Sequence, residues 1–120
     1  MNDNLIRASD ATEFPTRERL HIIERLNDPA APALSLADAR VEPGVTTELH
    51  KLTVDEWYVI RLGSGLMEVG GGLSFAVGPG DTVVIPAGSS QRISNTGKDD
   101  LQFQCICMPR FTPGSYEALE

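Results

Sequence analysis

Two stretches with turn residues at fixed spacings decide the fold: residues 44–63, GVTTELHKLTVDEWYVIRLG, and residues 80–95, GDTVVIPAGSSQRISN. Each contains short runs rich in apolar and β-branched residues, with glycine or proline where the runs end, which is the pattern of short strands between turns. Gly63 and Gly80 can adopt positive φ in those turns, and Pro86 lacks a backbone donor where a strand ends. Both stretches therefore predict strands rather than helices.

The same rhythm of short strands continues on either side of these stretches. Turns rich in glycine, proline and asparagine separate about nine candidate strands, and no segment predicts a long helix. The candidate strands are residues 20–26, 33–41, 46–52, 56–62, 66–69, 73–77, 81–85, 91–94 and 101–108. Residues 113–119 can form one terminal helical turn. Many short strands favour a sandwich or a barrel over a βαβ fold, so we expect an all-β protein.

The length of the chain suits one domain. We expect an N-terminal arm over residues 1–17 and a single β-domain over residues 18–120. The arm is polar, contains Pro15, and shows neither strand alternation nor a helical face.

Charge and composition exclude several classes of partner. The formal net charge of −7 repels phosphate backbones, and the ten Lys and Arg are scattered, so we expect no nucleic acid. No apolar run approaches bilayer length, and the N-terminus lacks the pattern of a secretory signal, so we expect no membrane association. Cys105 and Cys107 are one residue apart, which suits a reducing compartment better than a disulfide. These features predict a cytoplasmic protein.

Strand alternation sorts the residues that carry chemistry onto shared faces. The groups are His50 with Leu52, Glu56 with Tyr58, Gln91 with Ile93 and Asn95, and Leu101 with Phe103, Cys105 and Cys107. If two sheets close on each other, these faces meet in one cavity. Both thiols then point inward, where they are either small core residues or candidates for a ligand or redox role.

The spacing of the two quoted stretches resembles that of the cupin family. The first reads Gly44-x5-His50-x-Leu52-x3-Glu56-x6-Gly63, which is similar to the first cupin motif except that leucine replaces the second histidine. The second reads Gly80-x5-Pro86-x-Gly88-x2-Gln91-x3-Asn95, which is similar to the second motif except that glutamine replaces the histidine. The resemblance implies a small single-domain cupin, with a jelly-roll barrel of the double-stranded β-helix type.

The resemblance also implies a metal site. Metal-binding cupins converge three histidines and a glutamate on one divalent ion, usually Zn, Fe, Mn, Ni or Cu, and at the matching positions this chain has His50, Glu56 and Gln91. An imidazole, a carboxylate and an amide oxygen can hold such an ion and leave a position open for water or substrate. Leu52 supplies no ligand, and the amide of Gln91 is a weaker donor than imidazole.

Further residues are candidates for catalysis and for substrate binding. Glu56 can handle protons, and the Tyr58 hydroxyl can donate or shuttle one. Gln91 can instead hydrogen-bond a substrate, Cys107 lies on an inward face, and Arg110 follows the last strand, where it can meet a substrate at the pocket mouth.

Three functions follow from these expectations. The first is a metal-dependent enzyme that acts on a compact polar metabolite by isomerase, lyase or dioxygenase chemistry. The second is a metal-free cupin that binds a small molecule. The third is a structural or accessory dimer. Cupins usually dimerise, and the segment up to Leu26 is our candidate for pairing with a sheet edge of a second subunit, so we expect a homodimer.

Overall fold

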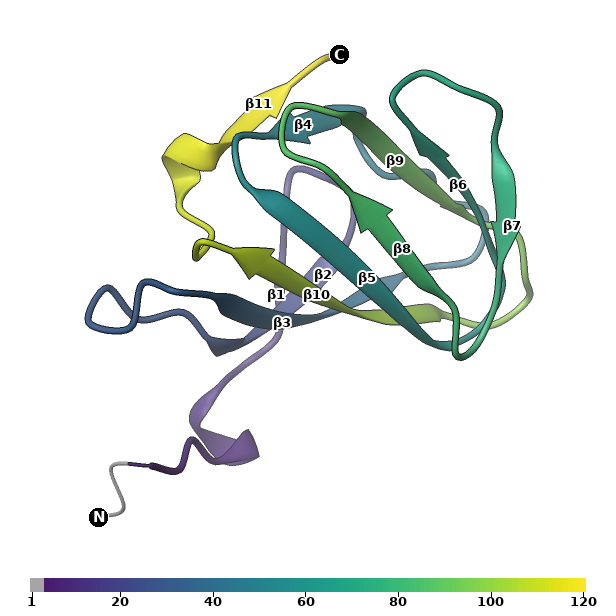
Figure 1. The fold of residues 1–120 in the computed structure, drawn as a ribbon. Coiled ribbons are helices and arrows are strands. Elements are labelled where there is room, and N and C mark those ends of the chain that lie inside the picture. The colour runs from purple at the N-terminus through teal and green to yellow at the C-terminus, as the bar shows by residue number, and fades with distance from the viewer. Residues whose placement is uncertain (1–3) are drawn as a thin grey trace.

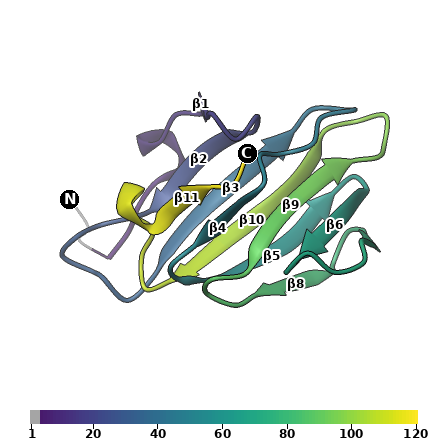
Figure 2. The ribbon, with the colours of Figure 1, turned by 90° about the horizontal axis from the view of Figure 1, so that it is seen from above.

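The computed structural model describes residues 4–120, which fold mainly into β-strands (Figure 1). The strands form two antiparallel sheets that face each other. In Figure 2, β4 and β9 of the smaller sheet lie over β10 and β5 of the larger one. The predicted all-β class with a jelly-roll barrel is confirmed.

The larger sheet has six strands in the order β1-β2-β3-β10-β5-β8. Their bounds are β1 Phe14–Pro15, β2 His21–Leu26, β3 Ser35–Val41, β10 Leu101–Met108, β5 Asp55–Leu62 and β8 Thr82–Ile85. The smaller sheet has five strands in the order β11-β4-β9-β6-β7. Their bounds are β11 Tyr116–Ala118, β4 His50–Leu52, β9 Ser90–Asn95, β6 Gly65–Val69 and β7 Phe75–Val77.

The facing sides of the two sheets pack into one hydrophobic core. In β10 the odd-numbered residues are buried while Gln102 and Met108 are exposed, as the alternation predicts. The most deeply buried apolar side chains come from both sheets: Val41, Ile60, Leu101 and Phe103 from the larger, and Met67 and Ile93 from the smaller. Burying each such side chain stabilises the fold by about 1.5–3 kcal/mol.

Both ends of the chain pack onto the barrel in forms that the sequence did not indicate. In the segment expected to be an arm, Phe14–Pro15 forms β1 and pairs with β2 of the same chain, and residues 1–3 lie outside the described residues. At the other end, only residues Pro113–Ser115 form a helical turn, of the 3-10 type, and Tyr116–Ala118 then pairs with β4. A second 3-10 turn covers Ala8–Asp10. In residues 4–120 no helix is long and apolar enough to cross a membrane.

A buried amide joins the two sheets at one end of the barrel. The Asn95 side chain, on β9, donates to the Val41 carbonyl on β3 and to the Asp99 carbonyl, both at 2.8 Å. Its amide oxygen accepts from the Gly97 N–H at 2.9 Å. Asn95 is therefore a structural clamp, which explains its place in the second motif.

Gly63, the last residue of the first motif, has no room for a side chain. Its φ is +86°, and a Cβ built there would lie 2.9 Å from the Asp100 carbonyl oxygen and 3.0 Å from the Leu101 Cα. Gly80 also has positive φ, +91°, but a Cβ there would meet nothing within 4 Å. Comparing an alanine substitution at each glycine therefore separates the cost of positive φ from the cost of a steric clash.

We expect Gly63→Ala to destabilise the protein by about 3 kcal/mol or more, because positive φ and a backbone clash both oppose the methyl group. Gly80→Ala is the matched control and should cost about 1–2 kcal/mol from φ alone. Urea unfolding of both variants measures the difference. Equal losses of stability would show that the contact with the segment at Asp100 plays no part.

Candidate functional site

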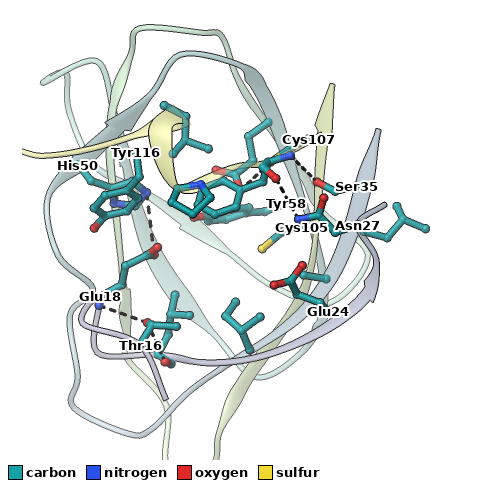
Figure 3. A pocket seen from close by; sticks show the side chains of 18 of the residues that line it. Thr16, Glu18, Glu24, Asn27, Ser35, His50, Tyr58, Cys105, Cys107 and Tyr116 are labelled. Carbon is teal, nitrogen blue, oxygen red and sulfur yellow. Dashed lines mark hydrogen bonds and ion pairs between the residues drawn. The ribbon is translucent and has the colours of Figure 1, made fainter. Parts of the chain in front are cut away.

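A cavity of about 450 Å³ opens within the barrel (Figure 3). Asn95 is not among its described lining residues. Strands β2, β3, β4, β5 and β10 contribute to its wall, together with the turn before β2 and the segment after β10. Its polar lining includes Thr16, Glu18, Glu24, Asn27, Ser35, His50, Glu56, Tyr58 and Tyr116. The inward faces of β4, β5 and the end of β10 thus meet in one cavity, whereas the inward residues of β9, Gln91, Ile93 and Asn95, do not line it.

His50 is held in one orientation on the cavity wall. It lies on β4 opposite Gln91 of β9, and only 2% of its surface is exposed. Its Nδ1 lies 2.7 Å from the Glu48 carbonyl, so Nδ1 carries the proton and donates it there. The Tyr116 ring stacks on the imidazole, with 4.7 Å between centroids and 17° between planes. The lone pair of Nε2 is therefore free for a proton or a ligand.

Glu18 faces His50 across the cavity wall. Its carboxyl Oε2 lies 4.0 Å from Nε2, which is too long for a direct hydrogen bond but close enough for both groups to contact one substrate molecule (Figure 3). Burial, together with the nearby carboxylates Glu56 and Glu48, raises the pKa of Glu18 to about 8. Burial lowers the pKa of His50. Near neutral pH, Glu18 thus holds a proton and His50 does not.

Glu56, Gln91 and Tyr58 form a hydrogen-bonded chain beside this pair. The Tyr58 hydroxyl donates to Gln91 Oε1 at 2.7 Å, and Gln91 Nε2 donates to Glu56 Oε1 at 2.9 Å. The Cys107 thiol donates to the other carboxylate oxygen of Glu56 at 3.5 Å. Burial raises the pKa of Glu56 and outweighs the lowering by the hydrogen bonds from Gln91 and Cys107, so that the pKa is about 7. All four groups are buried and partnered.

These donors, as arranged, do not fit a metal ion. Gln91 Oε1 already accepts from Tyr58, and both oxygens of Glu56 accept hydrogen bonds. Leu52 packs with Val54 and Cys107 in a small apolar cluster. Within residues 4–120, no three His, Cys, Asp or Glu side chains gather closely enough to hold a metal. The motif positions therefore form an internal hydrogen-bond chain, and no step below is routed through a metal.

The remaining expected site residues divide into two groups. Cys105 and Cys107 line the cavity, and burial raises the pKa of both thiols, so they stay neutral. Gln91 and Arg110 do not line it. Gln91 acts through Tyr58 and Glu56, and the Arg110 Nε donates to Asn27 Oδ1 at 2.8 Å, so Arg110 reaches the cavity through Asn27.

Glu18 and Tyr116 are site residues that the sequence did not reveal. Glu18 lies in the turn between β1 and β2, where the Thr16 N–H donates to the Leu20 carbonyl at 2.9 Å. Tyr116 begins β11, in a tail that was expected to be a helical turn. In the sequence they are only a carboxylate and an aromatic residue near the two ends of the chain. Neither belongs to a motif that would assign it to the site.

Two sequence comparisons show what this chain is similar to. A family model described as Cupin domain matches residues 37–107. The uncharacterized protein MJ1618 of Methanocaldococcus jannaschii is 39% identical over 87 residues, which cover 72% of this chain and 69% of that protein.

Solved structures share the fold. A variant of Streptomyces PAC13 with uridine superposes with a TM-score of 0.83 at 12% identity, covering 100% of this chain and 93% of that one. A predicted oxalate decarboxylase from Thermotoga maritima superposes with a TM-score of 0.77 at 26% identity, covering 88% of this chain and 98% of that one. At 12% identity, the likeness to PAC13 is one of fold alone.

The raised pKa of Glu56 makes stability depend on pH. Between pH 4.5 and about 7 the folded protein keeps a proton that the unfolded chain releases, so stability falls as pH rises through this window. We expect Glu56→Gln to remove this loss, so that the variant gains about 3 kcal/mol relative to the wild type between about pH 4.5 and pH 8. Urea unfolding across this range measures it.

The control for this prediction is Glu117→Gln. The Glu117 side chain is 60% exposed and pairs with Lys51 at 3.3 Å, so this variant should follow the wild-type profile. Parallel profiles for wild type and Glu56→Gln would show that Glu56 is ionised throughout.

Proposed function

Because the chain belongs to the cupin family, we propose that it binds a compact polar metabolite in its barrel cavity and transfers a proton on that molecule, in isomerase or lyase chemistry, through His50 and Glu18. One observation carries the proposal. A neutral imidazole nitrogen and a protonated carboxyl, 4.0 Å apart, face the same cavity. A base and an acid with separated protonation states are what proton transfer at neutral pH requires.

His50 acts as the base in this proposal. Its Nδ1–H is fixed on the Glu48 carbonyl, so Nε2 presents a lone pair to the substrate and can take a proton from a carbon next to a carbonyl. The stacked Tyr116 ring prevents the imidazole from turning away. The hydroxyl of Tyr116 is itself held, because it donates to Glu48 Oε1 at 2.5 Å.

Glu18 acts as the acid. With a pKa of about 8 it holds a proton near pH 7 and can give it to a substrate oxygen. In an isomerisation, the proton taken by His50 returns to the neighbouring carbon, which was the carbonyl carbon, and the hydroxyl on the carbon that lost the proton gives its own proton back to Glu18 as the new carbonyl forms. In an elimination, a leaving hydroxyl takes the Glu18 proton and departs as water, while the electron pair of the broken C–H bond forms the double bond.

The polar wall can orient the substrate. Ser35 and Asn27 both line the cavity, and the backbone of Phe111 fixes each of them: the Phe111 N–H donates to Ser35 Oγ at 2.9 Å, and Asn27 Nδ2 donates to the Phe111 carbonyl at 2.9 Å. Oriented hydroxyl and amide groups hold a polar ligand at low entropic cost.

The name of the Thermotoga maritima relative suggests oxalate as a substrate, and the charge of this cavity argues against carrying that name over. Three carboxyl groups, those of Glu18, Glu24 and Glu56, line the cavity. Arg17 is the one Lys or Arg in the described lining, and it pairs with Glu48 at 3.4 Å. A small dianion would meet repulsion here.

The test is hydrogen exchange on a panel of hydroxy ketones, aldoses and amino ketones, incubated with the protein in heavy water containing a chelator. We expect at least one compound to exchange the hydrogen next to its carbonyl, seen by proton NMR. His50→Gln should slow this exchange by about 10²–10⁴-fold, as the loss of a general base does. Glu117→Gln, outside the cavity, is the control and should exchange at the wild-type rate.

The same assay distinguishes metal-free proton transfer from the metal-dependent alternative. Elemental analysis of protein purified without chelator, and exchange after addition of zinc, manganese or iron, form its second arm. Exchange that appears only with added metal, exchange that persists in His50→Gln, or no exchange with any compound that binds would overturn the proposal.

A further inference from the structure

The cavity offers hydrogen-bond acceptors without matching donors. His50 Nε2 presents a lone pair to it from a side chain that is 98% buried, and no described residue donates a hydrogen bond to that nitrogen. The Glu24 carboxylate, on β2, is exposed and makes no hydrogen bond or ion pair with residues 4–120. Both groups call for a ligand that donates hydrogen bonds.

The charged groups that line the cavity also favour a ligand that is a hydrogen-bond donor and a cation. Glu18 and Glu56 join Glu24 there, and the Arg17 side chain, 70% exposed, turns to Glu48. Carboxyl groups gathered in one cavity with no free basic partner are an unfavourable arrangement, since the charge of one carboxylate opposes the ionisation of the others. A cation placed among them offsets that cost.

The walls suit the carbon skeleton of such a cation. Aromatic side chains from three separate segments line the cavity: Phe14 from β1, Phe111 after β10, and Tyr116 from β11. The faces of aromatic rings attract ammonium groups, and more strongly where water is excluded. The net charge of −7 on the whole chain also draws cations toward it.

We propose that the natural ligand of this cavity is a compact protonated amine, whose ammonium group pairs with the Glu24 carboxylate while the rest of the molecule reaches His50 Nε2 and Glu18. This inference rests on the proposed function and narrows its substrate class to amino-substituted metabolites. The ammonium neutralises the acidic lining, while its carbon skeleton packs against the aromatic wall.

The experiment compares ligands that match in shape and differ in charge. Benzylamine, benzyl alcohol and benzoate are titrated into the full-length protein by calorimetry, with butylamine, butanol and butyrate as a second series. We expect each amine to bind at least about tenfold more tightly than the matching alcohol, which corresponds to about 1.4 kcal/mol. The carboxylates should bind most weakly.

Charge-removing variants locate the effect. Glu24→Gln should reduce the preference for amine over alcohol by several fold, whereas Glu117→Gln should leave it unchanged. Glu24 is exposed, so its variant tests the inference without disturbing a buried group.

The outcomes separate this inference from the proposed function. Alcohols or carboxylates that bind as tightly as amines, a preference unaffected by Glu24→Gln, or no amine binding up to about 10 mM would overturn the inference. Hydrogen exchange on neutral ketones would then still support proton transfer. Amine preference without any exchange would overturn the proposed function and leave the inference standing.

Discussion

The structure depends on how its two sheets are joined at one end of the barrel. At the closed end, the buried Asn95 amide links β9 to β3 through the Val41 carbonyl. Gly63 lets the backbone at Asp100 approach without a side chain between them. These two motif residues close the barrel where only a short polar side chain and a glycine fit. The cavity within the barrel is lined by the inward faces of β4, β5 and the end of β10.

Fold and site were predictable from the sequence to different extents. Strand alternation and spaced turn residues are local signals, so β5, β8, β9 and β10 lie within a residue or two of their predicted bounds. The same alternation correctly placed His50, Glu56, Tyr58 and Cys107 on the cavity. The partners of these side chains were not predictable, because an amide such as Gln91 can serve equally well as a ligand or as a two-sided hydrogen-bond bridge.

The ends of the chain were the least predictable part, for a related reason. Glu18 and Tyr116 reach His50 from segments almost a hundred residues apart, and neither segment has a periodic pattern. Long-range contacts hold them in place: the Arg19 guanidinium donates to Glu120 at 2.8 Å and to the Thr46 carbonyl at 2.8 Å. Arg19 also has a φ of +70°, a conformation that is rare for a residue with a side chain and that short-range propensity disfavours. Only the assembled barrel makes that conformation favourable.

The two chain ends also explain why the cavity carries acids with raised pKa values. The turn that bears Glu18 and the segment that bears Tyr116 both line the cavity, in which burial raises the pKa of Glu18 and of Glu56. Burying two carboxyl groups near each other opposes folding above pH 4.5, and apolar residues of similar size would avoid that cost. Packing therefore does not account for these residues. Buried groups with perturbed pKa values, gathered in a cavity next to a histidine of fixed tautomer, are characteristic of sites that bind a ligand and move protons.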